Sequence, residues 1–324
     1  MLIRGEARLA RRSGGFHGGR LETPAAPPPG LAARVAAARA VADALTAARP
    51  LDERLTADPT QAKGGLDPRD RALARSIATV ALRRLGTIRK ALTLRLDKGM
   101  PRRGGALEWT LIVAAAQILF LDTPDHAAVD LAVKATRAEP ASAPFAALAN
   151  AVLRAIVRDR DQILADSDPL EDDTPAWLAQ RWRSTYGESL ARAIALAHRS
   201  EPTLDLSVRS DPAGWAEKLG GMVLPTGSVR LDTHAPVAEL EGYAEGQWWV
   251  QDAAAALPAR LLRPAAGMRV VDLCAAPGGK AAQLAAAGAD LTAVDRSAER
   301  LKLLAANLAR LSLNSEIVVA DALA

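Results

Sequence analysis

The stretch Val270–Lys280, V-V-D-L-C-A-A-P-G-G-K, decides the fold of this chain. Its first residues are apolar, which is typical of a strand buried on both faces of a parallel sheet. The strand runs into a turn of small residues, and an Ala-rich helix follows. Because Pro277 fixes one φ angle and Gly278 and Gly279 carry no Cβ, the backbone of the turn can pass close to a ligand. The first N–H groups of the helix would then be free to bind a carboxylate or a phosphate.

A Gly-Gly turn alone would indicate only a tight connection, but acidic residues on and after the predicted strands point to a ligand. Asp272 lies on the first strand, Asp295 ends the second strand-like run, and Asp321 ends the third. An acidic residue about 20 positions after the glycine turn binds ribose hydroxyls in βαβ nucleotide sites, and such ligands bind at the carboxyl ends of strands. The glycine spacing is not G-x-G-x-x-G, which disfavours NAD and a dinucleotide oxidoreductase. S-adenosyl-L-methionine fits better, with its amino-acid end at the turn, its ribose at Asp295 and its adenine near Asp321.

Composition restricts the class of protein. A chain of 324 residues with 49% hydrophobic residues predicts two or three globular domains, and a net charge of +4 permits a polyanionic partner without requiring one. Cys274 is the one cysteine, so we expect neither a disulfide framework nor a thiol metal site, and the histidines show no metal-ligand spacing. We expect no membrane span and no secretory signal, and therefore a location in the cytoplasm. We also expect the protein to be a monomer.

The N-terminal part of the chain is predicted to be helical after a disordered leader. Residues 1–30 are rich in Arg, Gly and Pro, and residues 31–165 show helical periodicity throughout. Leu107–Leu121 is apolar almost all round and should be the central helix of a bundle. Thr123 and Pro124 are predicted as the N-cap and the first residue of the next helix.

The middle of the chain, residues 166–262, is predicted as a helical linker followed by a small α+β module. The linker begins with an acidic segment, residues 166–174, and continues as a pair of helices in which Trp177 and Trp182 are expected to pack. Strands are predicted at 204–208, 229–232 and 247–250, with a helix over 253–262. Residues 263–324 then form the first half of a Rossmann-like domain.

The helical block resembles the NusB family of antitermination factors. The resemblance lies in D-P-R-D-R-A-L-A at Asp67–Ala74, P-D-H-A-A-V-D-L-A-V at Pro124–Val133 and A-N-A-V-L-R at Ala149–Arg154. NusB-type domains bind RNA or proteins, so the resemblance implies a recognition module. Its candidate RNA face is the arginine-bearing helix Arg69–Lys90, although a charged face that contacts only solvent explains the same residues.

The C-terminal part resembles the RNA 5-methylcytosine methyltransferases, and the NusB-like block in front makes it similar to their bacterial small-subunit ribosomal RNA type. The motifs are W-V-Q-D at Trp249–Asp252, D-L-C-A-A-P-G-G-K at Asp272–Lys280 and A-V-D at Ala293–Asp295. The resemblance implies S-adenosyl-L-methionine as cofactor and a cytosine of 16S ribosomal RNA as substrate. It implies a cofactor site made of Cys274, Ala275, Ala276, Pro277, Gly278, Gly279, Lys280, Asp295 for ribose and Asp321 on the adenine side.

The resemblance also implies a catalytic thiol that this sequence does not supply. Carbon 5 of cytosine becomes nucleophilic only after a thiolate adds at carbon 6. In the family this cysteine follows the third strand, whereas Cys274 occupies a position in the cofactor loop. We therefore expect the sequence, which ends at Ala324, to be a fragment whose nucleophile lies further on, and to be inactive by itself. The alternative is a non-catalytic RNA-binding or ribosome-assembly protein with a degenerate nucleotide fold.

Overall fold

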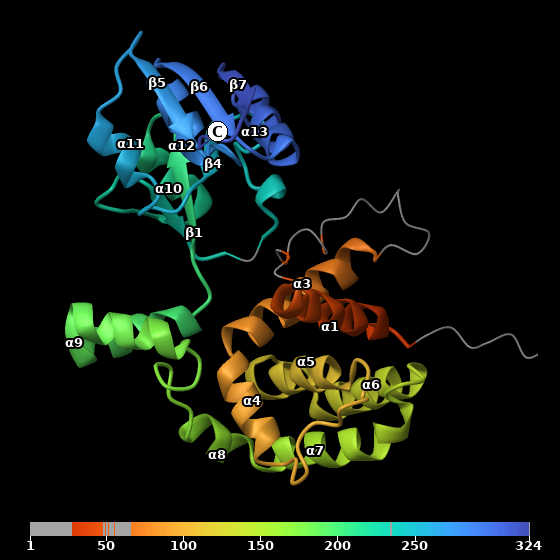
Figure 1. Ribbon diagram of the computed structural model, residues 1–324. Coiled ribbons are helices and arrows are strands. Elements are labelled where there is room, and N and C mark those ends of the chain that lie inside the picture. Colours follow the sequence, from red (N-terminus) through yellow and green to blue (C-terminus); the bar gives the residue numbers. More distant parts are fainter. Residues whose placement is uncertain are drawn as a thin grey trace, which may run out of the picture. The chain divides into compact units, whose positions relative to one another are not determined.

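The computed structural model describes residues 28–47, 49, 51, 55, 66–233 and 235–323. Nearly all of the predicted leader therefore lies outside the described residues. The chain divides into two compact units, with the boundary between Ser200 and Glu201 (Figure 1). Among the described residues, no helix is both long enough and apolar enough to cross a lipid bilayer.

The first unit is helical and is built around α5. Because almost every side of this helix is apolar, it is buried from Leu107 to Leu119 except for a few half-exposed positions, and it contacts α1, α3, α4, α6 and α7. This confirms the predicted central helix. The helices of the bundle are α1 (Leu31–Thr46), α3 (Pro68–Arg83), α4 (Leu85–Thr93), α5 (Leu107–Phe120), α6 (Asp125–Ala138), η1 (Ala143–Phe145), α7 (Ala146–Arg158) and α8 (Arg160–Ala165).

Two helix ends differ from the prediction. The predicted helix Arg69–Lys90 is wrong because the chain leaves helical geometry at Arg84, with φ −114° and ψ 22°, so that α3 and α4 are separate helices. Helix α6 has its predicted bounds, but Pro124 occupies the N-cap position with extended ψ of 131°. The prediction of Thr123 as the N-cap was therefore wrong, and no side chain caps this helix.

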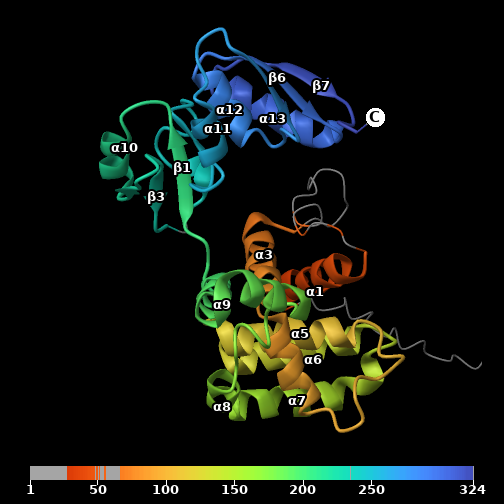
Figure 2. The same ribbon diagram turned by 60° about the vertical axis from the view of Figure 1, so that its left-hand side comes forward.

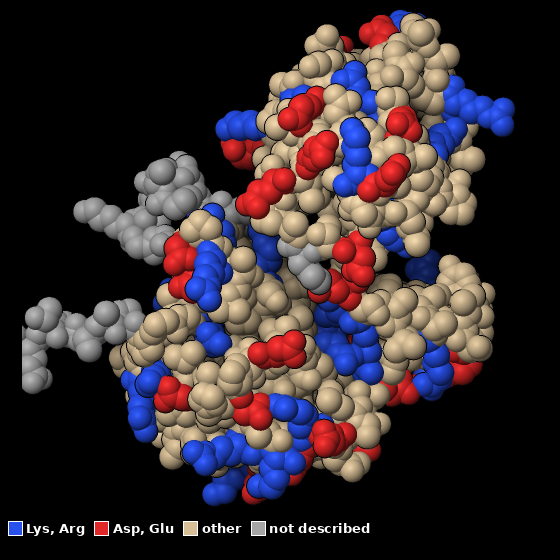
Figure 3. All heavy atoms as spheres, turned by 180° about the vertical axis from the view of Figure 1, so that it is seen from behind, with Lys and Arg blue, Asp and Glu red and all other residues tan. Residues whose placement is uncertain are grey.

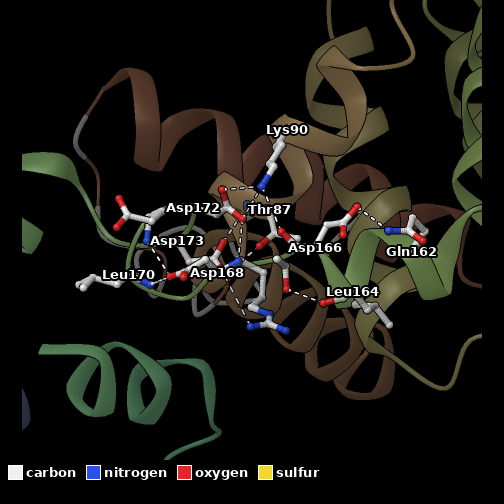
Figure 4. Close-up of polar contacts among 12 residues, drawn as sticks. Thr87, Lys90, Gln162, Leu164, Asp166, Asp168, Leu170, Asp172 and Asp173 are labelled. Atoms are coloured by element: carbon white, nitrogen blue, oxygen red, sulfur yellow. Dashed lines mark hydrogen bonds and ion pairs between the residues drawn. The ribbon is translucent and has the colours of Figure 1, made fainter. Parts of the chain in front are cut away.

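The acidic segment 166–174, predicted as a linker, packs on α4 of the same unit (Figure 4). The Asp173 carboxylate, 4% exposed, accepts hydrogen bonds from the backbone N–H and the hydroxyl of Thr87 at 2.8 and 3.0 Å. Arg199 donates to the same carboxylate at 2.7 Å, and Lys90 pairs with Asp172 at 3.0 Å. The segment thereby joins α4 to the end of the helix that follows it, at Arg199.

Helix α9 (Ala176–Arg199) is a pair of helices, as expected, because Gly187 breaks it at φ 78° and ψ 168°. Trp182 contacts a small apolar cluster with Leu170. Trp177 is 66% exposed, so its prediction as a packing residue was wrong. Helical periodicity alone did not show which side of α9 would find a partner.

The second unit begins with an antiparallel sheet of strand order β2-β3-β1-β4, of which β1 and β3 are labelled in Figure 2. Trp248, the first residue of β4, is fully buried in an apolar cluster with Leu206 and Leu231. The predicted strands are present, and the two-residue strand β2 was not predicted. The elements are β1 (Leu204–Val208), α10 (Pro212–Leu219), β2 (Met222–Val223), β3 (Val229–Leu231), η2 (Val237–Glu239) and β4 (Trp248–Val250).

The unit continues with a parallel sheet of order β5-β6-β7. Helices α12 and α13 pack against one face of it, where Leu284 of α12 and Leu304 of α13 share a cluster with Leu291 of β6. The side chains of Val271 and Leu273 point to the other face and are 59% and 57% exposed, so the expectation of a strand buried on both faces was wrong for the described residues. The elements are α11 (Leu257–Leu262), β5 (Arg269–Leu273), α12 (Gly279–Ala286), β6 (Asp290–Asp295), α13 (Ala298–Arg310) and β7 (Glu316–Val319).

Helix α11 begins later than predicted. The sequence predicted a helix from Ala253, but the chain forms turns over 253–256 and becomes helical at Leu257. Pro258 stands in the first turn of the helix, where its missing N–H needs no partner. The Asp252 carboxylate holds the preceding turn by accepting the Ala255 N–H at 2.9 Å.

Candidate functional site

The predicted cofactor turn lies where β5 and β6 end, at the carboxyl edge of the parallel sheet. Cys274 leaves the strand with φ 62°, and the Ala275 N–H donates to the Val294 carbonyl at 2.9 Å. The next N–H, of Ala276, donates to the Asp295 carboxylate at 3.2 Å. The turn is therefore fixed to the end of β6, and the sheet brings the two predicted parts of the site together.

Gly278 has a structural reason that the sequence did not reveal, whereas a Cβ at Gly279 would meet only ordinary van der Waals contact. Gly278 has φ 110°, which only glycine adopts readily, and a Cβ there would lie 3.2 Å from the side chain of Leu304 on α13. A Cβ on Gly279 would contact Gln251 at 3.6 Å. Gly278 is thus required by its own backbone and by the close packing of α13, in addition to any approach of a ligand.

The W-V-Q-D motif holds the beginning of α12 in place. The indole N–H of Trp249 lies 3.1 Å from the Gly279 carbonyl and 3.0 Å from the Gln251 side-chain oxygen. The Ser207 hydroxyl donates to the same Gln251 oxygen at 2.8 Å, and the Gln251 amide donates to Gln283 on α12 at 3.1 Å. The sequence identified this motif only by resemblance. Its positioning role follows from contacts with β1 and α12, which are distant from it in sequence.

Asp295 is oriented toward the turn. Its side chain is 4% exposed and accepts the Ser297 N–H at 2.9 Å as well as the Ala276 N–H. These two backbone hydrogen bonds, that from Ser297 first, hold the pKa of Asp295 below its ordinary value against the cost of burial, with a further contribution from Arg300. Arg300 spans this part of the site, because one of its nitrogens lies 3.9 Å from the Asp295 carboxylate and another donates to the Ala276 carbonyl at 2.6 Å.

Asp272, on β5 beneath the turn, is in the opposite situation. Burial raises its pKa, the charge of Lys280 lowers it in part, and the charge of Asp295 raises it further. One of its carboxylate oxygens is buried and has no hydrogen-bond partner among the described residues. Because an unpaired buried acceptor is costly, this oxygen suits a ligand that brings a donor such as an ammonium group.

The remaining predicted residues lie at the same edge of the sheet. Asp321 is exposed two residues after β7, and its carboxylate accepts the Leu323 N–H at 2.9 Å. The neighbouring Ala320 N–H donates to the backbone carbonyl of Asp295 at 3.2 Å, which places this strand end beside the site. Cys274 and Lys280 are exposed on the turn. The turn and Asp295 are thus in direct contact, whereas Asp321 is joined to them only through the backbone.

Comparisons with known proteins identify the families that the two parts of the chain resemble. The model of the NusB family matches residues 31–158, and the model of the 16S rRNA methyltransferase RsmB/F family matches residues 259–323. The crystal structure of PH0851 superposes with a TM-score of 0.63 at 19% identity, covering 91% of this chain and 70% of that protein, which supports the fold alone.

Two bacterial proteins named ribosomal RNA small subunit methyltransferase B are more similar in sequence. That of Xanthomonas campestris pv. campestris is 37% identical over 84% of this chain and 63% of its own length. That of Xylella fastidiosa strain Temecula1 is 35% identical over 90% of this chain and 69% of its own length. The chain therefore spans roughly two thirds of the length of these relatives, and it belongs to the ribosomal RNA small subunit methyltransferase B family.

Proposed function

We propose that this protein binds S-adenosyl-L-methionine at the turn Cys274–Lys280 and serves the methylation of carbon 5 of a cytosine in 16S ribosomal RNA. The observation that carries the proposal is the contact between the turn and Asp295 at the carboxyl edge of a parallel sheet. The names of the relatives support ribosomal RNA as the substrate class. A ribosomal RNA substrate would place the activity in the cytoplasm, where we expect a monomer.

Each part of the site has a proposed role. The N–H groups that open α12 have no acceptor within the helix and would bind the carboxylate of the cofactor's amino-acid end. The unpartnered oxygen of Asp272 would accept a hydrogen bond from the cofactor's ammonium group. Asp295 would accept hydrogen bonds from the ribose hydroxyls, and Asp321 would lie beside the adenine. When bound, the cofactor supplies an electrophilic methyl group; the residues named here bind and orient it.

Access to Asp295 requires a side chain to move. Two backbone N–H groups already occupy its carboxylate, but a carboxylate offers about four acceptor positions. Arg300, whose side chain is 57% exposed, stands beside the remaining ones. We propose that Arg300 turns outward when the ribose binds, because more than half of its side chain is exposed and water can replace its hydrogen bond to the Ala276 carbonyl.

Titration calorimetry of the full-length protein with S-adenosylhomocysteine and with NAD tests the cofactor assignment. Asp295→Asn should weaken S-adenosylhomocysteine binding by about 1–3 kcal/mol, the contribution of a hydrogen bond to a charged group. Asp290→Asn is the matched control, since Asp290 lies exposed at the opposite end of β6. Preferential binding of NAD, or equal affinity of both variants and the wild type, would contradict the proposal.

A further inference from the structure

The helical unit contains a groove between α6 and α7 that neither the predicted cofactor site nor the packing of the bundle explains. Its volume is about 1070 Å³, and its lining comes from Asp125 to Arg137 on α6 and from Ala146 to Arg158 on α7. The floor is apolar, with Leu131, Val133 and Val157 among the lining residues. A concavity of this size is large enough for a ligand of several hundred cubic ångströms.

The rim of the groove is basic. Arg137, Arg154 and Arg158 line it and are exposed. The last two stand four residues apart on one face of α7, in a row that begins with Asn150. On the face seen in Figure 3, Lys and Arg side chains gather at the lower end of this unit, with Asp and Glu side chains between them.

The acidic residues of the groove do not neutralise this rim. Asp125 pairs with Arg160 and Asp130 pairs with Lys134, so each has a cation of its own outside the lining. Among the described residues, Arg137 and Arg154 form no ion pair with a carboxylate; Arg154 donates only to the Asn150 side chain, at 3.2 Å.

Arg158 also contributes to the positive charge. It shares its partner Asp159 with Arg95, at 2.9 and 2.8 Å. One carboxylate faces two guanidinium groups, and their hydrogen bonds hold the pKa of Asp159 below its ordinary value. The groove therefore retains a surplus of positive charge along its rim.

The ligand that matches these features is single-stranded RNA. We propose that the α6–α7 groove binds single-stranded RNA, with phosphates on the arginine rim and bases on the apolar floor. Guanidinium groups bind phosphate oxygens and stack on bases, and unstacked bases offer both apolar faces and hydrogen-bonding edges. His126 and Asn150, which also line the groove, supply donors and acceptors for such edges.

Three basic residues at the C-terminal end of the predicted RNA face, Arg84, Arg89 and Lys90, are engaged within the protein. Arg84 lies over the Phe120 ring and 3.6 Å from Asp173, and its side chain is only 16% exposed. Arg89 pairs with Glu108, and Lys90 pairs with Asp172. This contrast favours the groove as the RNA surface.

The inference rests on the proposed function, because it assigns the RNA of that activity to a surface. The test uses the full-length protein and a fluorescein-labelled RNA 20-mer of mixed, unstructured sequence, with anisotropy measured at several salt concentrations. The groove variant is Arg137→Gln/Arg154→Gln, which adds no repulsive charge. The matched control is Arg39→Gln/Arg69→Gln, which removes two exposed arginines from α1 and α3.

The groove variant should bind the RNA about tenfold or more weakly, and the slope of log K against log salt should become shallower by about 1.4, or 0.7 for each lost phosphate contact. The control should bind like the wild type. Equal weakening of both variants, no weakening of either, or a poly-glutamate peptide that binds the groove more tightly than the RNA would overturn the inference.

Calorimetry with S-adenosylhomocysteine on the same proteins separates this inference from the proposed function. If the wild type binds the cofactor analogue and the RNA but the groove variant keeps its RNA affinity, only the groove assignment fails. If the wild type binds no cofactor analogue, the proposed function fails whatever the RNA data show. If the wild type binds no RNA, both the groove and the RNA substrate are rejected. Circular dichroism of each variant verifies that its helices are intact.

Discussion

Asp272 and Asp295 are two carboxylates of one site whose pKa values are shifted in opposite directions. Backbone N–H groups lower the pKa of Asp295, whereas burial raises that of Asp272 and leaves one of its oxygens unpaired. A carboxyl group with a raised folded-state pKa lowers the stability of the folded protein once pH exceeds its unfolded-state pKa. Asp272 therefore does not stabilise the ligand-free protein at neutral pH, and the proposed cofactor would offer its unpaired oxygen a hydrogen-bond donor.

Asp272→Asn should stabilise the ligand-free protein and weaken its binding of S-adenosylhomocysteine. The substitution removes a buried charge, and we expect a gain of about 1 kcal/mol in the free energy of unfolding at pH 7, within the usual range of stabilising substitutions. Thermal unfolding without and with the cofactor analogue measures both effects. A variant that is less stable than the wild type without ligand would show that Asp272 has a structural role instead.

Asp205 illustrates a carboxylate that is paired for stability. Its side chain is 2% exposed and receives two hydrogen bonds from Arg230, at 2.7 and 2.8 Å, and one from the Ala253 N–H at 3.1 Å. The bonds from Arg230 are the main reason that the pKa of Asp205 is lowered. The pair joins β1 to β3 and to the turn before α11.

Arg230→Met should destabilise the second unit by about 2 kcal/mol at pH 7, less than for a fully buried pair because Arg230 is 39% exposed. The pH dependence has a definite sign. With a folded-state pKa below the unfolded value of about 3.9, Asp205 stabilises the protein fully above that value and loses its contribution as pH falls through the folded-state pKa. The wild type should therefore lose more stability than the variant between about pH 5 and pH 2.5 in urea unfolding. Parallel pH profiles would contradict this role of Arg230.

At the scale of elements, Gly86 determines how the acidic segment fits on α4. A Cβ at this position would overlap the carbonyl oxygen of Asp172. The backbone of residues 172–173 therefore lies directly against the first turn of α4, where Asp173 receives both hydrogen bonds from Thr87. The helix begins with a glycine at its second residue because the segment occupies the space of a side chain.

Gly86→Ala should destabilise the helical unit even though alanine is the better helix former. Helix propensity favours alanine by about 1 kcal/mol, but overpacking against a fixed backbone costs about 1–3 kcal/mol or more, so we expect a net loss of about 1–2 kcal/mol. Thr93→Ala, at an exposed position of the same helix, is the control and should be neutral or slightly stabilising. Urea unfolding followed by helical circular dichroism measures both; a stabilised Gly86→Ala protein would mean that the segment moves away without cost.

At the scale of the whole molecule, the chain consists of two units with separate apolar cores. The helical unit contains the large cluster around α5 and the small cluster with Leu170, and two further clusters lie in the second unit. Separate cores allow separate cooperative transitions, so a single free energy of unfolding need not describe the chain.

We expect calorimetry of the protein to show two thermal transitions. Gly86→Ala should lower the midpoint of one of them, and Arg230→Met should lower the midpoint of the other, because the two residues belong to different units. Each variant thereby shows which transition belongs to the unit that carries the substitution. If either substitution shifted both midpoints by the same amount, the two units would unfold as one cooperative block.

The sequence by itself determined the class of fold and the location of the turn that we propose as the cofactor site. Helical periodicity identified the central helix α5, and the turn residues after β5, together with the strand that ends at Asp295, led to the candidate site. These signals are local, since the period of apolar residues and the backbone freedom of glycine and proline act over a few positions.

The tertiary structure alone decided which polar groups find partners. Gln251 and Ser207 are far apart in sequence, as are Asp173 and Thr87, so the sequence does not predict their hydrogen bonds. The first bond helps to hold the candidate site in place, and the second holds the acidic segment on α4. The tertiary structure likewise decided that Trp177 and Leu273 stay exposed while Arg84 is covered, and that an arginine-rimmed groove forms between α6 and α7. Burial and charge compensation depend on which surfaces meet, and no local pattern of residues encodes that meeting.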